Sequence, residues 1–86
     1  MLYWMVQGYR NSQEHGQPLG PFQTAEVAIG VGNGLLVESQ AIHEVTVHHR
    51  LCTGKAHLSF SNPIPEEDIA YAVAKLEQSA MKAMAL

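Results

Sequence analysis

One stretch of alternating side chains constrains this chain more than any other. From Val45 to Leu51, apolar and polar residues alternate with the period of two that a half-buried β-strand requires. Thr53-Gly54 follows as a two-residue turn, and the residues from 55 to 60 alternate again. The predicted cross-strand pairs are Cys52 with Lys55, Leu51 with Ala56, Arg50 with His57, His49 with Leu58 and Val47 with Phe60. A slip of one residue would turn Leu58 and Phe60 to the polar face, so the pattern itself selects this pairing.

A helix is predicted after this hairpin. Asn62-Pro63-Ile64-Pro65 ends the strand, and three acids, Glu66 to Asp68, occupy the first turn, where the helix dipole favours negative charge. Its expected inner stripe is Ile69, Val73, Leu76, Ala80 and Met84. The same spacing would also suit a pair of helices from two copies of the chain, although packing within one chain is the preferred interpretation.

An earlier helix is predicted from Thr24 to Glu38. Thr24 suits the N-cap position, and Glu26 places an acid in the first turn. Gly30, Gly32 and Gly34 each cost about 1 kcal/mol relative to alanine, so tertiary packing has to compensate. Gly32 falls on the apolar side of this helix, where a missing side chain would allow close approach to a sheet.

The N-terminal quarter predicts strands. Residues 2 to 9 are rich in aromatic and apolar types, residues 11 to 18 are polar, and Leu19 to Phe22 could form a short edge strand despite Pro21. The predicted fold is therefore α+β: a two-layer sandwich in which an antiparallel sheet of three or four strands carries two helices on one face, in the order β-(β)-α-β-β-α.

The passage into the first helix resembles part of a known family. Trp4, followed by the segment from Gly16 to Glu26, is similar to the opening of GYF domains, where a Gln-Gly-Pro-Phe-Ser/Thr-x-x-Glu segment leads from a hairpin into a helix and helps to form a site for proline-rich peptides. Leu35-Leu36 stands where that family has aromatic residues, and the chain departs from it from Glu38 onward. The resemblance implies a hairpin-to-helix passage with Phe22 as an apolar plug before the N-cap.

Length and composition narrow the classes of function. The 86 residues suffice for one domain, 1–86, and 47 % hydrophobic against 15 % charged residues predict a folded chain. The net charge of −3 argues against binding double-stranded nucleic acid. A single cysteine, together with a short apolar start that lacks a positive region, leads us to expect a cytoplasmic protein without a membrane segment. No cofactor motif, catalytic residue or catalytic constellation is legible, so we expect no enzyme.

The first strand predicts an interaction surface because both of its faces are apolar. If the helices cover the Trp4 side, its other side chains lie on the open face beside the polar side of the later hairpin. The expected interaction face comprises Tyr3, Met5, Tyr9, His48, Arg50 and His57. Such aromatic, polarisable and mildly cationic surfaces are enriched at protein interfaces, so we expect a protein partner or a second copy of the chain.

Two alternatives use the same face. His48, Cys52 and His57 could together hold a metal ion or small ligand, although Arg50 and Lys55 would oppose a cation there. Open aromatic side chains could instead bind single-stranded nucleic acid weakly. The other two histidines of the hairpin region, His43 and His49, point inward by parity and are interpreted as core residues.

Overall fold

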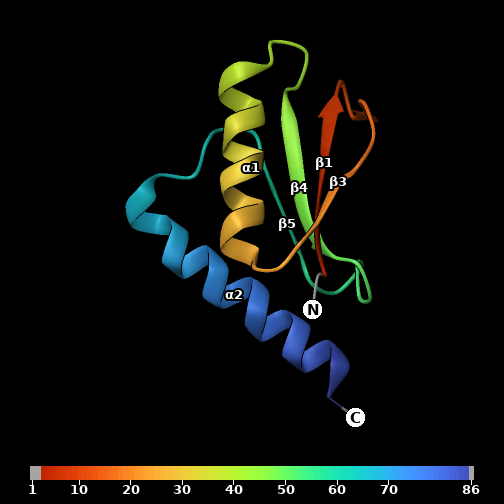
Figure 1. Cartoon of the computed structure of the whole chain (residues 1–86), viewed down its shortest axis with the longest axis vertical. Coiled ribbons are helices and arrows are strands. Elements are labelled where there is room, and N and C mark those ends of the chain that lie inside the picture. The colour runs from red at the N-terminus through yellow and green to blue at the C-terminus, as the bar shows by residue number, and fades with distance from the viewer. Residues whose placement is uncertain (1–2, 86) are drawn as a thin grey trace.

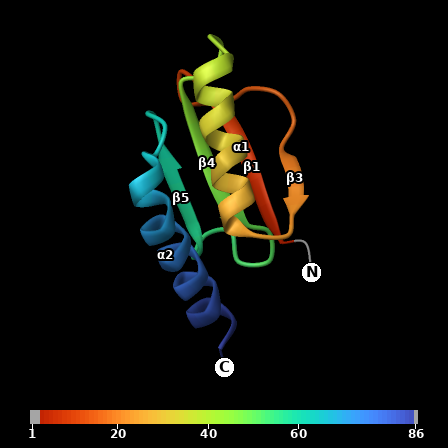
Figure 2. The ribbon, with the colours of Figure 1, turned by 60° about the vertical axis from the view of Figure 1, so that its left-hand side comes forward.

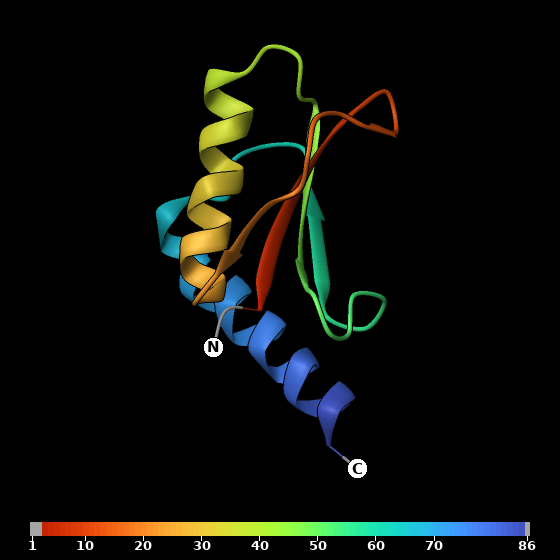
Figure 3. The ribbon, with the colours of Figure 1, turned by 45° about the vertical axis from the view of Figure 1, so that its right-hand side comes forward.

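The computed structural model describes residues 3–85, which form one antiparallel sheet and two helices (Figure 1). The strands are β1 (Trp4–Arg10), β2 (Gln13–Glu14), β3 (Leu19–Phe22), β4 (Glu44–His49) and β5 (His57–Phe60); the helices are α1 (Ala25–Glu38) and α2 (Glu66–Met84). The strand order is β2-β1-β4-β5, and β3 also pairs with β1. Both helices lie on the same side of the sheet, and Figure 3 shows its other face free of helices. The predicted α+β sandwich is confirmed, with β2 as an additional short strand.

The start of α1 follows the predicted capping chemistry. Thr24 is the N-cap, and its Oγ1 accepts a hydrogen bond from the Val27 N–H at 3.2 Å. Phe22 ends β3 and packs against the core just before this cap, as expected from the passage between hairpin and helix.

The core lies between α1 and the central strands β1 and β4. Alternate residues of β1 and β4 point inward and meet the buried side of α1, and Figure 2 shows α1 lying over these strands. Its fully buried large side chains are Val6, Ile29, Val45 and Val47. Gly32 makes this packing possible, because a Cβ there would lie 3.1 Å from Phe60 Cζ and 3.2 Å from Val45 Cγ2. The predicted close approach of the helix at Gly32 is therefore confirmed.

The predicted pairing of the second hairpin is wrong by two residues. His48 pairs with His57 and Val47 with Leu58, and Val45 takes the place opposite Phe60. The expected Thr53-Gly54 turn would need a positive φ at Thr53, which a β-branched residue resists. Instead β4 ends at His49 and a longer loop folds on itself, with Cys52 N–H donating to His49 C=O at 3.1 Å and Ala56 N–H to Cys52 C=O at 2.9 Å. A shift of two residues leaves each side chain on the face of the sheet that was predicted for it.

The longer loop removes Cys52 from the outer face. Its side chain packs against the core cluster instead, which corrects its predicted position beside the histidines. The prediction that His43 points inward is wrong: the residue is exposed just before β4, because the strand begins only at Glu44. His49 is a core residue as predicted, with 2 % of its surface exposed.

Helix α2 contacts the rest of the domain by a narrow side. Its buried residues are Ala72, Leu76 and Ala80. Met84 was predicted to belong to the inner stripe, but it is 47 % exposed and lies outside it. Figure 1 shows the reason: the C-terminal part of α2 runs past the end of the sheet. The segment before α2 is held to α1 by Asn33, whose Oδ1 accepts from Ile64 N–H at 2.9 Å and whose Nδ2 donates to Ile64 C=O at 3.0 Å.

The three glycines of α1 should respond differently to substitution. Gly30→Ala and Gly34→Ala should each raise the free energy of unfolding by up to about 1 kcal/mol, because a Cβ there meets no atom within 4 Å. Gly32→Leu should lower it by about 1 to 3 kcal/mol, because the larger side chain has to displace Phe60 and Val45. Urea unfolding of the three variants measures this, and an equal gain at all three positions would contradict the close approach.

Candidate functional site

The helix-free face of the sheet carries its side chains in rows across three strands. The register places Met5, His48 and His57 in one row and Gln7, Thr46 and Ser59 in the next. Thr46 Oγ1 and Ser59 Oγ lie 2.8 Å apart and share a hydrogen bond, so the second row is tied together across β4 and β5. Strand pairing thus brings together three of the expected interaction residues.

The remaining expected residues lie apart from this row. Tyr9 is on the same face at the far end of β1, where it pairs with Glu44. Tyr3 precedes β1, and its ring stacks on the buried His49 with a centroid distance of 4.8 Å. Arg50 follows the end of β4 and is exposed, and its backbone N–H donates to Tyr3 C=O at 2.7 Å. The expected face is therefore divided, with its centre at Met5, His48 and His57.

The segment between β2 and β3 covers part of the open face. Gln7 points toward this face but is only 3 % exposed, and its Nε2 donates to Gly16 C=O at 3.2 Å and to Gly8 C=O at 2.8 Å. A buried amide with its donors bonded is a structural group rather than a ligand-binding one. What stays open is the half of the face formed by β4 and β5.

A shallow hollow of about 490 Å³, lined mainly by polar residues, extends over this face from the segment around β2 to β4 and β5. Its lining residues are Gln7, Tyr9, Glu14, Pro18, Thr46, His48, Thr53, Gly54, His57 and Ser59. Burial lowers the pKa of His48, and the neighbouring His57 lowers it further. The His48 imidazole is therefore neutral at neutral pH and presents a hydrogen-bonding side chain rather than a cation.

The three residues that the sequence offered as an alternative metal site are not assembled. Cys52 packs against the core, whereas His48 and His57 lie on the opposite face of the sheet. Within residues 3–85 no three His, Cys, Asp or Glu side chains are grouped so that they could hold one metal ion. His49 Nδ1 accepts a hydrogen bond from Leu51 N–H at 3.2 Å, and Trp4 packs edge-on against its ring, so this imidazole belongs to the core.

Sequence reasoning missed a second feature, the free edge of β5 and the groove beside it. β5 is the last strand of the sheet and α2 runs next to it, as Figure 2 shows. A groove of about 670 Å³ lies between them. Its lining residues are His57, Leu58, Phe60, Ile64, Asp68, Tyr71, Ala72, Lys75, Leu76 and Ser79. Strand order places β5 at the edge, and side-chain alternation alone does not predict strand order.

The backbone of β5 has hydrogen-bonding groups directed away from the sheet. His49 N–H donates to Ala56 C=O at 2.9 Å, which places the ladder bonds to β4 at every second residue, on Leu58 and Phe60. The N–H and C=O groups of His57 and Ser59 therefore point to the free edge. On the α2 side of the groove, Tyr71 is 68 % exposed and Lys75 Nζ lies 5.6 Å from the centre of its ring.

No protein-family model, curated protein or solved structure matches this chain. The likeness to GYF domains covers only Trp4 and the hairpin-to-helix segment. No helix formed by residues 3–85 is long and apolar enough to cross a membrane.

The lowered pKa of His48 should be visible in two measurements: an NMR titration of its imidazole, and the pH dependence of the free energy of unfolding. Its imidazole should titrate below the usual 6.5, and His57→Ala should raise the midpoint only partly, because burial is the larger cause. As the pH falls below about 6.5 the unfolded chain takes up the proton first, so the free energy of unfolding should decrease there and stay constant above. His43→Ala is the control. A His48 midpoint above 6.5 would contradict the assigned environment.

Proposed function

We propose that this protein is a binding module without a catalytic step of its own, and that it takes up an extended segment of a partner protein along β5. The observation that carries the proposal is the free edge of β5 beside an apolar groove. Strand addition requires both parts: backbone groups supply affinity, and pockets for alternate side chains supply specificity.

The groove is suited to alternate apolar side chains. Leu58 and Phe60 point inward from β5 and are only partly buried, and Leu76 and Ala72 line the helix side. An incoming strand would place every second side chain between these residues. The exposed ring of Tyr71 offers a further contact, because aromatic side chains supply large contact area at interfaces.

The open face supports the same location for the partner. His57 and Ser59 line the polar hollow with their side chains and the free edge with their backbone. The outward side chains of an added strand would therefore continue the rows of the open face, next to His57. This joins the expected interaction face to the edge of β5 and restricts it to the β4–β5 half, since Gln7 is covered on β1.

Protein binding is favoured over the other sequence-based alternatives. Arg50 lies beyond the end of β4 and not within the row of Met5, His48 and His57, so the face has less positive charge than binding to single-stranded nucleic acid requires. The separation of Cys52 from the histidines weakens the alternative of a metal-responsive or small-ligand regulator.

A peptide selected from a random display library against the whole protein tests the proposal. The selected peptide should protect the amides of His57 and Ser59 from hydrogen exchange, whereas those of Leu58 and Phe60 are protected already in the free protein. Ser59→Pro should weaken binding about ten-fold or more, because it removes a free-edge N–H and obstructs an approaching strand. Calorimetry measures the affinity.

Two controls separate the edge from the rest of the site. Ser59→Ala removes only the hydroxyl contact with Thr46 and should bind within about two-fold of the original protein. Tyr71→Ser should weaken binding, and Met81→Ser, an equally exposed change on α2 outside the groove, should not. Undiminished binding by Ser59→Pro would overturn the proposal. Protection of the His57 and Ser59 amides by a second copy of the chain, without peptide, would overturn it as well.

A further inference from the structure

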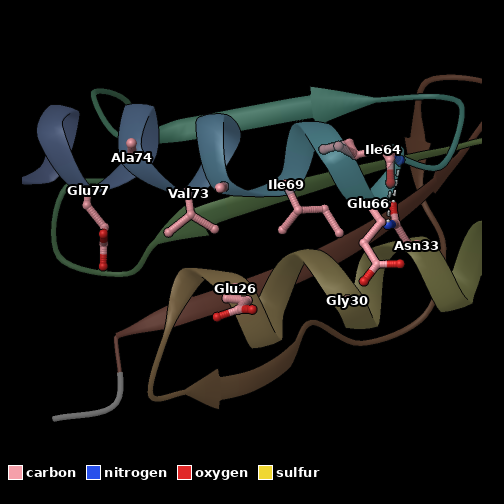
Figure 4. A pocket seen from close by; sticks show the side chains of 10 residues that line it. Glu26, Gly30, Asn33, Ile64, Glu66, Ile69, Val73, Ala74 and Glu77 are labelled. Atoms are coloured by element: carbon pink, nitrogen blue, oxygen red, sulfur yellow. Dashed lines mark hydrogen bonds between the residues drawn. The ribbon is translucent and has the colours of Figure 1, made fainter.

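A third surface, separate from the sheet, lies between the two helices. The groove between α1 and α2 has a volume of about 750 Å³ and is drawn in Figure 4. Its lining residues are Glu26, Gly30, Asn33, Ile64, Glu66, Ile69, Ala70, Val73, Ala74 and Glu77. It lies on the helix side of the domain, and only Ile64 is shared with the groove beside β5.

The groove is open because its walls carry small residues. Gly30 is exposed on α1, and a Cβ there would meet no atom within 4 Å, so the space above it is vacant. In Figure 4, Ile69 and Val73 point from α2 toward α1, and both are half-buried. Two apolar side chains thus line a groove that the domain does not fill by itself.

The charge around this groove has a single sign. Three carboxylates line it, from Glu26 on α1 and from Glu66 and Glu77 on α2, and none of its lining residues is Lys, Arg or His. The carboxamide of Asn33 is already bonded on both sides to Ile64. Charge complementarity therefore favours an occupant that combines apolar with cationic side chains.

The backbone of the groove walls favours a helical occupant. Both walls are helices, whose N–H and C=O groups are bonded within the helix except for the N–H groups in the first turn of α2 at Glu66, so the walls described here offer no row of free backbone groups along the groove. An extended peptide would bury its own unpaired backbone groups there, whereas a helix arrives with them satisfied. The lining of α2 from Glu66 to Glu77 corresponds to about three helical turns.

We infer that the α1–α2 groove is a docking site for a basic amphipathic helix of a partner protein. The apolar side of that helix lies on Ile69 and Val73 and over Gly30, and its Lys or Arg side chains reach the carboxylates of Glu26 and Glu77. This site is independent of strand addition at β5, so the module has one surface for an extended segment and another for a helix.

A designed peptide of about four helical turns, with Leu and Ala on one side and Lys on the flanks, is the probe. Added to the isotope-labelled protein, it should shift the NMR signals of Gly30, Ile69 and Val73. The same peptide with Glu in place of each Lys should bind at least about ten-fold more weakly. Raising the salt concentration should weaken the Lys peptide, since the charges lie at the rim.

Two matched pairs of variants locate the site. Gly30→Leu should fill the groove and reduce affinity at least about ten-fold, whereas Gly34→Leu, one turn along α1 and equally free of contacts, should not. Glu26→Gln with Glu77→Gln should reduce affinity about five-fold, whereas Glu67→Gln, an exposed acid of α2 outside the groove, should not.

Several outcomes would overturn the inference. These are the absence of peptide-induced shifts in the original protein, equal binding of the Lys and Glu peptides, and undiminished binding by Gly30→Leu. A protein dimer that Gly30→Leu alone converts to monomer would show that a second copy occupies the groove, and would also overturn it. Ser59→Pro should leave the Lys peptide unaffected, so failure here and failure of strand addition are distinguishable.

Discussion

The close approach of α1 to the sheet at Gly32 is the constraint on which the rest of this structure depends. Val45 and Phe60 occupy the space where a side chain at position 32 would lie, so one helix position sets the thickness of the core. Ala28 and Ile29, the buried residues one turn earlier, reach the central strands only at this distance. The same geometry explains a helix with three glycines: packing at one of them offsets a helix propensity that is poor at all three.

The start of α2 is held to α1 by one polar side chain, in addition to the apolar packing of α2 against the core. Asn33 is next to Gly32 and holds both backbone groups of Ile64, which fixes the point from which α2 starts. Because α2 buries only Ala72, Leu76 and Ala80, it leaves a groove on each side, one toward β5 and one toward α1. The two proposed binding surfaces are thus consequences of how little of α2 the core needs. One uses the unpaired backbone of an edge strand, and the other uses space that small residues leave vacant between helices whose backbones are satisfied.

Local chemistry was predictable where a residue acts on its own segment. Thr24 caps α1 as expected, and the inward parity of Val45 and Val47 is correct. The pairing of β4 with β5 was not, because parity survives a shift of two residues and the loop after His49 is closed by hydrogen bonds that alternation does not encode. That loop is also why Cys52 packs against the core, and why the alternative metal set of His48, Cys52 and His57 does not assemble.

The sequence by itself determined the class of fold, which side of β4 is buried, where α1 begins and why Gly32 faces the sheet. These depend on spacing within one segment, which is short-range information. Only the tertiary structure decided that β5 is the free edge, that the segment before β3 covers Gln7, and that acids from both helices line one groove. Each of these requires segments distant in sequence to meet, and such meetings depend on strand order and helix crossing rather than on the periodicity of any one segment.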